Sequence, residues 1–189
     1  MKTIGILAIQ GDFNRHAQVI KQLGHLPREI RDLDELAGTH ALIIPGGEST
    51  TFLRLFNQFN LSDGIRQYAK DHSIMGTCAG LIILSKVVND LPHEPLGLID
   101  VSVARNAYGR QRESFVDSIS LSLNGTTYKF PGVFIRAPKI IAIGPMVKIL
   151  AYHKKDPVMV SSNNILAATF HPELTDSKEI HQYFINNFT

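Results

Sequence analysis

A cysteine flanked by glycines, placed between two apolar segments, constrains the fold of this chain more than any other feature. Residues 73–77 form a short apolar run that enters the pentapeptide Gly76-Thr77-Cys78-Ala79-Gly80, and residues 79–88 are again largely apolar. The pentapeptide is the G-x-S-x-G pattern with cysteine in place of serine, a sharp strand-to-helix turn that exposes a nucleophile. The sequence therefore predicts a strand over 73–77, a helix over 79–88 and a reactive thiol between them. A helix N-terminus directly after Cys78 favours the thiolate, whereas an ordinary turn with an inert cysteine is the alternative.

Apolar runs alternate with helical patterns along the first half of the chain. Strands are predicted over residues 3–9, 26–31 and 41–44, and helices over residues 13–23, 49–57 and 62–71. Gly24 is a candidate C-cap of the first helix, and Ser49-Thr50-Thr51 a candidate N-cap of the second. Such alternation predicts a mainly parallel sheet with helices on both faces.

The later half has a different pattern. Ser118–Leu123 alternates polar and apolar residues with period two, and Asn124-Gly125 is a hairpin turn signal. A return strand over 126–130 is expected, then strands over 133–136, 140–143, 147–152, 158–161 and 165–170 and a helix over 177–188. The sequence thus predicts one α/β domain over residues 1–189, with antiparallel strands in its later half.

Composition excludes several classes of function. The 189 residues include 19 Lys and Arg and 17 Asp and Glu, with no basic block, so neither nucleic acid nor an anionic membrane is an expected partner. No apolar run reaches the ~18–20 residues of a membrane-spanning helix. One cysteine cannot form an internal disulfide, which indicates a reduced, cytoplasmic protein. Neither a metal-ligand pattern nor a G-x-G-x-x-G loop after a strand is present, so no metal or cofactor is predicted.

A thiolate nucleophile needs a base, and His171 is the best placed of eight histidines. It follows the predicted strand 165–170 and begins His171-Pro172-Glu173. Pro172 favours an extended His171, and residues two apart in an extended chain face the same side. Glu173 could then accept the imidazole N–H, as the third member of a catalytic triad does. A structural His-Pro turn is the alternative. The other histidines lack an evident partner and are expected at solvated or helix-surface positions: His16, His25, His40, His72, His93, His153 and His181.

A third motif, Pro45-Gly46-Gly47-Glu48-Ser49-Thr50, separates the strand over 41–44 from the next helix. It lacks the Gly-Lys-Ser/Thr ending of a phosphate-binding loop. The backbone N–H of Gly47, together with that of Ala79, could instead form an oxyanion hole. A simple strand-to-helix turn is the alternative.

These three motifs resemble those of the class I (triad) glutamine amidotransferases. Further segments extend the resemblance to the glutaminase subunit of pyridoxal 5′-phosphate synthase. They are Ala8-Ile9-Gln10-Gly11, Arg105-Asn106, Gly109-Arg110-Gln111, Ser114-Phe115, Gly132-Val133-Phe134-Ile135-Arg136-Ala137-Pro138 and Phe170–Thr175. The pair Gly-Gly-Glu-Ser-Thr-Thr and Val-Phe-Ile-Arg-Ala-Pro is specific to that family. The resemblance implies a three-layer, flavodoxin-like α/β fold.

The resemblance also implies a reaction, the hydrolysis of L-glutamine to glutamate and ammonia. Cys78 would attack the side-chain amide and form a γ-glutamyl thioester, with His171 as proton carrier and Glu173 orienting it. The residues implied to line the glutamine site are Gly47, Glu48, Ser49, Arg105, Ile135 and Arg136. An arginine suits the substrate carboxylate because it can form paired hydrogen bonds with it.

The resemblance finally implies a partner, the synthase subunit, which would use the ammonia to make pyridoxal 5′-phosphate. That compound would be the product of the pathway and not a cofactor of this chain. Such glutaminases are generally weak alone, and the Gly46–Gly47 peptide is the candidate switch because glycine lets a backbone N–H reorient easily. Two alternatives stay open: a triad glutaminase of another biosynthetic pathway, and a non-enzymatic redox sensor built on the same cysteine turn.

Overall fold

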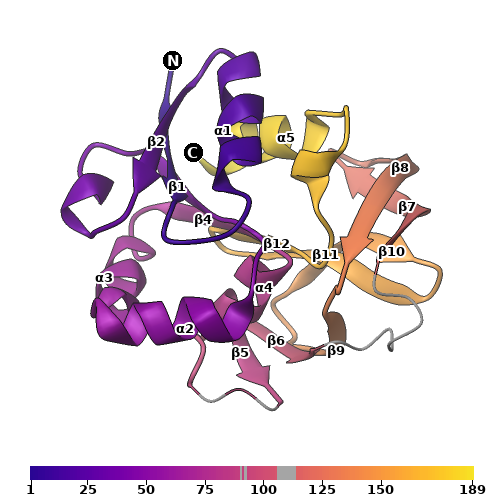
Figure 1. The fold of residues 1–189 in the computed structure, drawn as a ribbon. Coiled ribbons are helices and arrows are strands. Elements are labelled where there is room, and N and C mark those ends of the chain that lie inside the picture. Colours follow the sequence, from indigo (N-terminus) through magenta and orange to yellow (C-terminus); the bar gives the residue numbers. More distant parts are fainter. Residues whose placement is uncertain (90, 92, 106–113) are drawn as a thin grey trace.

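The computed structural model describes all residues except 90, 92 and 106–113 (Figure 1). The segment Gly109-Arg110-Gln111 and Asn106, which contribute to the resemblance above, therefore lie outside the described residues.

The first half of the chain alternates strands and helices, as predicted. Its elements are β1 (Thr3–Leu7), α1 (Phe13–Gln22), β2 (Leu26–Ile30), a 3-10 turn (Asp34–Leu36), β3 (Ala41–Ile44), α2 (Ser49–Gln58), α3 (Leu61–Tyr68), β4 (Ser73–Thr77) and α4 (Ala79–Leu84). Gly24 follows α1 with a φ of 79°, the left-handed backbone that a glycine C-cap supplies.

The later half consists mostly of strands. They are β5 (Ser85–Val88), β6 (Ile99–Ala104), β7 (Ser114–Leu123), β8 (Thr126–Ile135), β9 (Lys139–Ile143), β10 (Lys148–His153), β11 (Asp156–Ser162) and β12 (Ile165–Ala168). A 3-10 helix (Pro172–Leu174) and α5 (Glu179–Phe188) complete the chain.

Among the described residues, nine strands form one mixed sheet in the order β2-β1-β3-β4-β12-β11-β10-β7-β8. Neighbours from β2 to β12 are parallel, and those from β12 to β8 are antiparallel. The mainly parallel first half and the antiparallel later half are thus confirmed. Strand β12 pairs in register with β4, so that Ala168 lies opposite Thr77. A smaller sheet has the order β5-β6-β9.

Helices cover both faces of the large sheet, α1 and α5 on one side and α2, α3 and α4 on the other (Figure 1). Strand β3 shows why: Leu42 and Ile44 pack with the apolar residues of α2 to α4, whereas Ala41 and Ile43 pack with those of α1 and α5. Because successive side chains of a strand alternate faces, this fully apolar strand is buried by both layers.

The structure corrects several predicted elements. The helix predicted over 79–88 ends at Leu84, and Ser85–Val88 is strand β5, because pairing with β6 overrides a helical pattern too short to be decisive. Strand β6 was not predicted. The strands predicted over 126–130 and 133–136 are one strand, β8, which continues through Pro131 at the edge of the sheet. In the described part of the chain, no helix has the length and apolarity needed to cross a membrane.

Candidate active site

Cys78 occupies the turn between β4 and α4, as predicted. Its backbone has φ 49° and ψ −102°, a conformation that non-glycine residues rarely adopt. The Cys78 N–H donates to the carbonyl oxygen of Ala168 at 2.8 Å, which fixes the turn to β12. A Cβ atom on Gly80 would overlap the carbonyl oxygen of Ile44, and one on Gly76 would overlap the backbone of Gly80. Gly80 therefore lets α4 pack directly against β3, and Gly76 lets α4 pack against β4.

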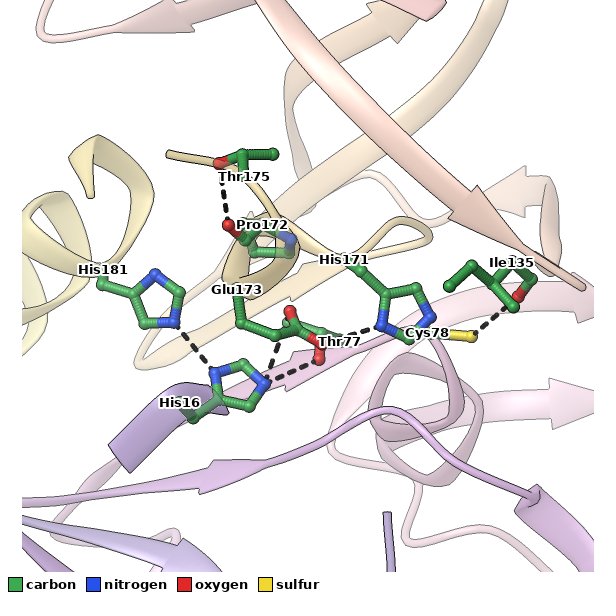
Figure 2. Close-up of polar contacts among 9 residues, drawn as sticks. All are labelled: His16, Thr77, Cys78, Ile135, His171, Pro172, Glu173, Thr175 and His181. Atoms are coloured by element: carbon green, nitrogen blue, oxygen red, sulfur yellow. Dashed lines mark hydrogen bonds and ion pairs between the residues drawn. The ribbon is translucent and has the colours of Figure 1, made fainter. Parts of the chain in front are cut away.

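His171 and Glu173 meet beside this turn. The His171 Nδ1 atom lies 2.7 Å from Glu173 Oε1, and Figure 2 shows the imidazole between this carboxylate and Cys78. The predicted pairing is present, but its predicted cause is wrong in part. Glu173 lies in the 3-10 helix that starts at Pro172 and not in an extended chain. Both side chains are almost fully buried, which shields their contact from water.

His171 and Glu173 each stabilise the charged form of the other. Burial acts to lower the pKa of His171, but the hydrogen bonds and charges of Cys78 and Glu173 outweigh it and raise that pKa to about 10. Burial acts to raise the pKa of Glu173, whereas His16 and His171 lower it to about 2. At neutral pH the arrangement thus holds an imidazolium against a carboxylate on one side and the Cys78 sulfur on the other.

A cavity of about 520 Å³ opens in front of the cysteine. It brings together all six residues implied to line a glutamine site, together with Cys78 and His171. Sequence reasoning did not assign three further lining residues: Asp12, Ile82 and Ser114. Asp12 adjoins Gln10-Gly11 and Ser114 belongs to a quoted segment, so both had a sequence signal, whereas Ile82 is one apolar residue among many on α4.

The C-terminal end of β8 lies near the Cys78 sulfur, at the cavity. The Cys78 Sγ atom lies 3.6 Å from the carbonyl oxygen of Ile135, the last residue of β8. The next residue, Arg136, has a φ of 44°, so the chain turns sharply where the arginine enters the cavity lining.

The Gly46–Gly47 peptide is held in one orientation. The Gly46 carbonyl oxygen accepts from the Asp12 N–H at 3.2 Å. Because carbonyl and N–H point in opposite directions in a trans peptide, this bond also fixes the direction of the Gly47 N–H. A reorientation of this peptide would break the bond to Asp12. The oxyanion role of Gly47 and Ala79 stays a prediction.

Glu48 is the N-cap of α2, a role that the sequence analysis did not predict. Its carboxylate accepts from the backbone N–H groups of Thr50 and Thr51 and so caps α2, where Ser49-Thr50-Thr51 had been the predicted cap. Burial acts to raise the pKa of Glu48, but hydrogen bonds from the side chains and the backbone N–H groups of Thr50 and Thr51 lower it to about 2. The Glu48 Oε1 atom also lies 3.5 Å from Nη2 of Arg105, so an arginine and a carboxylate face each other at the cavity.

Three histidines contradict the prediction of solvated or helix-surface positions. His16, His153 and His181 are buried. His153 pairs with Asp117 at 2.8 Å. His16 contacts His181, and it also lies next to Glu173 and Thr77, behind the candidate triad (Figure 2). A signal existed for His16, which is four residues before Ile20 and so lies on the apolar face of α1.

Comparison with known proteins agrees with this geometry. Residues 6–189 match the SNO glutamine amidotransferase family. The pyridoxal 5′-phosphate synthase subunit PdxT of Thermosipho africanus is 45% identical over 184 residues, which are 97% of this chain and 97% of that protein. PdxT of Thermus thermophilus is 42% identical over 185 residues, covering 96% of this chain and 95% of that protein.

Solved structures agree as well. A crystal structure of a glutamine amidotransferase has a TM-score of 0.90 at 41% identity and covers 97% of both chains. The structure of PurLQS from Thermotoga maritima has a TM-score of 0.75 at 16% identity, which is a likeness of fold alone. The predicted class I glutamine amidotransferase fold is therefore confirmed. With a family match over nearly its whole length and relatives above 40% identity, the chain belongs to the SNO glutamine amidotransferase family.

Proposed function

We propose that residues 1–189 form one glutaminase domain that hydrolyses L-glutamine to L-glutamate and ammonia through Cys78, His171 and Glu173. The observation that carries this proposal is the burial of the His171–Glu173 pair beside the strained Cys78 turn, at the wall of a cavity lined by two arginines. A cysteine paired with an oriented histidine is the arrangement that acyl transfer requires.

The reaction would proceed in two stages. The Cys78 thiolate attacks the side-chain amide carbon of glutamine, and a carbon–sulfur bond forms while the carbonyl oxygen becomes an oxyanion. The N–H groups of Gly47 and Ala79 stabilise this charge. His171 gives its proton to the nitrogen as the carbon–nitrogen bond breaks, and ammonia leaves a γ-glutamyl thioester. Water then attacks the thioester carbon and gives a proton to His171, and the carbon–sulfur bond breaks. This releases glutamate and restores the Cys78 thiolate and the His171 imidazolium.

The two arginines have a natural role in binding. Glutamine carries an α-carboxylate, for which Arg105 and Arg136 supply planar donors at the cavity wall. Glu48, held as a carboxylate by the α2 N-terminus, offers a partner for the α-ammonium group. Ser49, Ile135 and Gly47 complete the walls of the same cavity.

The ammonia needs an acceptor, and we propose that the acceptor is the synthase subunit of pyridoxal 5′-phosphate synthase, in complex with this chain. The support is that the relatives at 42–45% identity are described as PdxT subunits of that synthase. A cytoplasmic location suits a mechanism that depends on a reduced cysteine. On this proposal the chain uses no metal and no cofactor.

The test measures glutamate release from L-glutamine by the wild type and by Cys78→Ala, each with and without the synthase subunit. We expect weak activity that rises when the synthase is added and is absent in Cys78→Ala. Activity that ignores the synthase would contradict the proposed partner. Equal activity of Cys78→Ala would overturn the assignment of the nucleophile. Rapid peroxide oxidation of Cys78 without any glutamine turnover would favour the redox sensor.

A further inference from the structure

Two buried histidines extend the polar contacts of the triad carboxylate into the core. His16 lies on α1 and His181 on α5, and neither has any measurable exposure to solvent. The His16 Nδ1 atom lies 2.9 Å from His181 Nε2. On its other side, His16 Nε2 lies 3.2 Å from Thr77 Oγ1 and 3.5 Å from Glu173 Oε2 (Figure 2). Helix α1 thus contacts the carboxylate through His16, and α5 contacts His16 through His181.

The second carboxylate oxygen of Glu173 depends on this contact. Oε1 accepts from His171, but Oε2 is buried and has no standard hydrogen bond within the described residues. The ion-pair contact that Oε2 makes in that part of the chain is the one with His16 Nε2. An uncompensated carboxylate oxygen in a dry environment is strongly destabilising. A proton on His16 Nε2 would provide the needed compensation.

The hydrogen-bond directions follow from this requirement. A carboxylate only accepts, so the His16 nitrogen that faces it must carry the proton. A neutral His16 then accepts at Nδ1, and His181 must donate from Nε2. This leaves His181 Nδ1 as an acceptor without a partner, which agrees with its lack of any hydrogen bond among the described residues. The opposite tautomer would place a lone pair of His16 against the carboxylate.

Burial keeps His16 neutral. Burial lowers the pKa of His16, Glu173 acts to raise it, His171 to lower it and Asp12 to raise it. Burial, and then His16 itself, lower the pKa of His181 to about 3. Thr77, from β4, adds no charge. At neutral pH the pair therefore acts as two oriented dipoles and not as cations.

We propose that His16 is a positioning residue, whose Nε2–H, set by His181, holds the Glu173 carboxylate so that Oε1 stays aligned with His171 Nδ1. The N–H groups then point in one direction: His181 donates to His16, and the Nε2–H of His16 faces Glu173 Oε2 at 3.5 Å. The Nδ1–H of His171 donates to the other oxygen of the same carboxylate. This orientation leaves the other nitrogen of His171 to face Cys78. The inference rests on the proposed function, because it assigns His16 to the same triad.

The experiment compares the wild type with His16→Leu, which removes the donor, and His16→Gln, whose amide nitrogen can take the place of Nε2. His153→Gln is the matched control, because His153 is also buried and paired with a carboxylate but belongs to a separate contact with Asp117. Glutaminase kinetics are measured in the presence of the synthase subunit. The rate of Cys78 alkylation by iodoacetamide is measured against pH without glutamine or synthase.

We expect His16→Leu to lower kcat about tenfold or more, with KM within about twofold, because His16 does not line the cavity. Its alkylation profile should move on the acidic side by about one pH unit to higher pH, since a displaced carboxylate stabilises the imidazolium less. His16→Gln should restore most of both properties, and His153→Gln should match the wild-type pH profile even if it lowers stability.

A wild-type pH profile in folded His16→Leu would overturn the inference, as would a change confined to KM. Failure of the proposed function is a separate result. It would appear as a wild type without glutaminase activity, whereas the alkylation profiles would still report whether His16 acts on the Cys78–His171 pair. If His16→Leu does not fold, ¹⁵N spectra of histidine in the wild type decide the matter. A neutral His16 with its proton on Nε2 is expected, and a proton on Nδ1 would overturn the inference.

Discussion

His171 Nδ1 lies 2.7 Å from Glu173 Oε1 because the chain turns into a 3-10 helix at Pro172 and brings the carboxylate back under the imidazole. The backbone N–H of His171 donates to the carbonyl oxygen of Val133 at 2.8 Å, which fixes the backbone of the base against β8. The contact is therefore local in sequence but fixed by the large sheet.

Glu173→Gln should lower kcat for glutamine by at least about 10²-fold, since an amide cannot stabilise the imidazolium as a carboxylate does. The pKa of His171, raised to about 10 by Cys78 and Glu173 against the effect of burial, should fall. The alkaline side of the pH–rate profile should consequently move to lower pH. Steady-state kinetics from pH 6 to 10 would check this, and an unmoved alkaline limb would contradict it.

Glu48→Ala should remove the cap of α2 and lower the free energy of unfolding by about 1 kcal/mol. Glu48→Asn should keep a cap and lose little stability, because asparagine is a favoured N-cap residue. Both variants lose the carboxylate that faces Arg105, so both should raise KM for glutamine. Urea unfolding and kinetics on the two variants separate these roles. A wild-type KM in Glu48→Asn would refute the role in binding.

Gly80→Ala should destabilise the fold by at least about 2 kcal/mol, because the new methyl group would overlap the Ile44 carbonyl oxygen and force β3 and α4 apart. The matched control is Gly125→Ala, which has open space around the added atom but a positive φ. It should lose about 1–2 kcal/mol through backbone strain alone. Thermal unfolding of both would test the difference, and equal losses would contradict a packing effect.

Buried neutral histidines should make the protein lose stability in mild acid. The pKa of His181 is lowered to about 3, chiefly by burial, so below pH 6.5 the unfolded chain takes up a proton that the folded chain does not. Between pH 7 and pH 5 this should remove about 2 kcal/mol. His181→Gln should lack that loss.

Urea unfolding at both pH values measures this difference. His171 titrates with the opposite sign, because its raised pKa adds stability that is complete below pH 6.5 and is lost toward pH 10. It is present in both proteins and cancels in their comparison. An equal pH dependence of the wild type and His181→Gln would show that His181 takes up its proton as easily in the folded chain.

Local patterns predicted much of the fold and the central residues of the site. The elbow around Cys78 and the His171-Pro172-Glu173 segment are continuous in sequence, so their residue types and spacing were sufficient. The cap at Glu48 was missed because glutamate is not among the usual cap residues. Strand β5 was missed because its conformation is decided by pairing with β6, a strand that the sequence did not predict either.

The burial of His16 and His181 shows another limit. Each lies on the apolar face of its helix, so the periodicity did indicate burial, but the partners come from opposite ends of the chain. Only the packing of α1 beside α5 brings them together, and neither helix carries a sequence signal for that contact.

The register between β4 and β12 positions the nucleophile relative to the base. Ala168 lies opposite Thr77, so Cys78 directly follows the end of β4 and His171 lies three residues beyond the matching end of β12. Neighbouring strands lie about 4.8 Å apart, so strand pairing brings the two residues together across a long stretch of chain. The segment from β5 to β11 lies outside this pairing, and within it β8 contacts the site through Val133 and Ile135. Loops there that do not contact the site can change in length or outer surface without altering the register of β4 and β12.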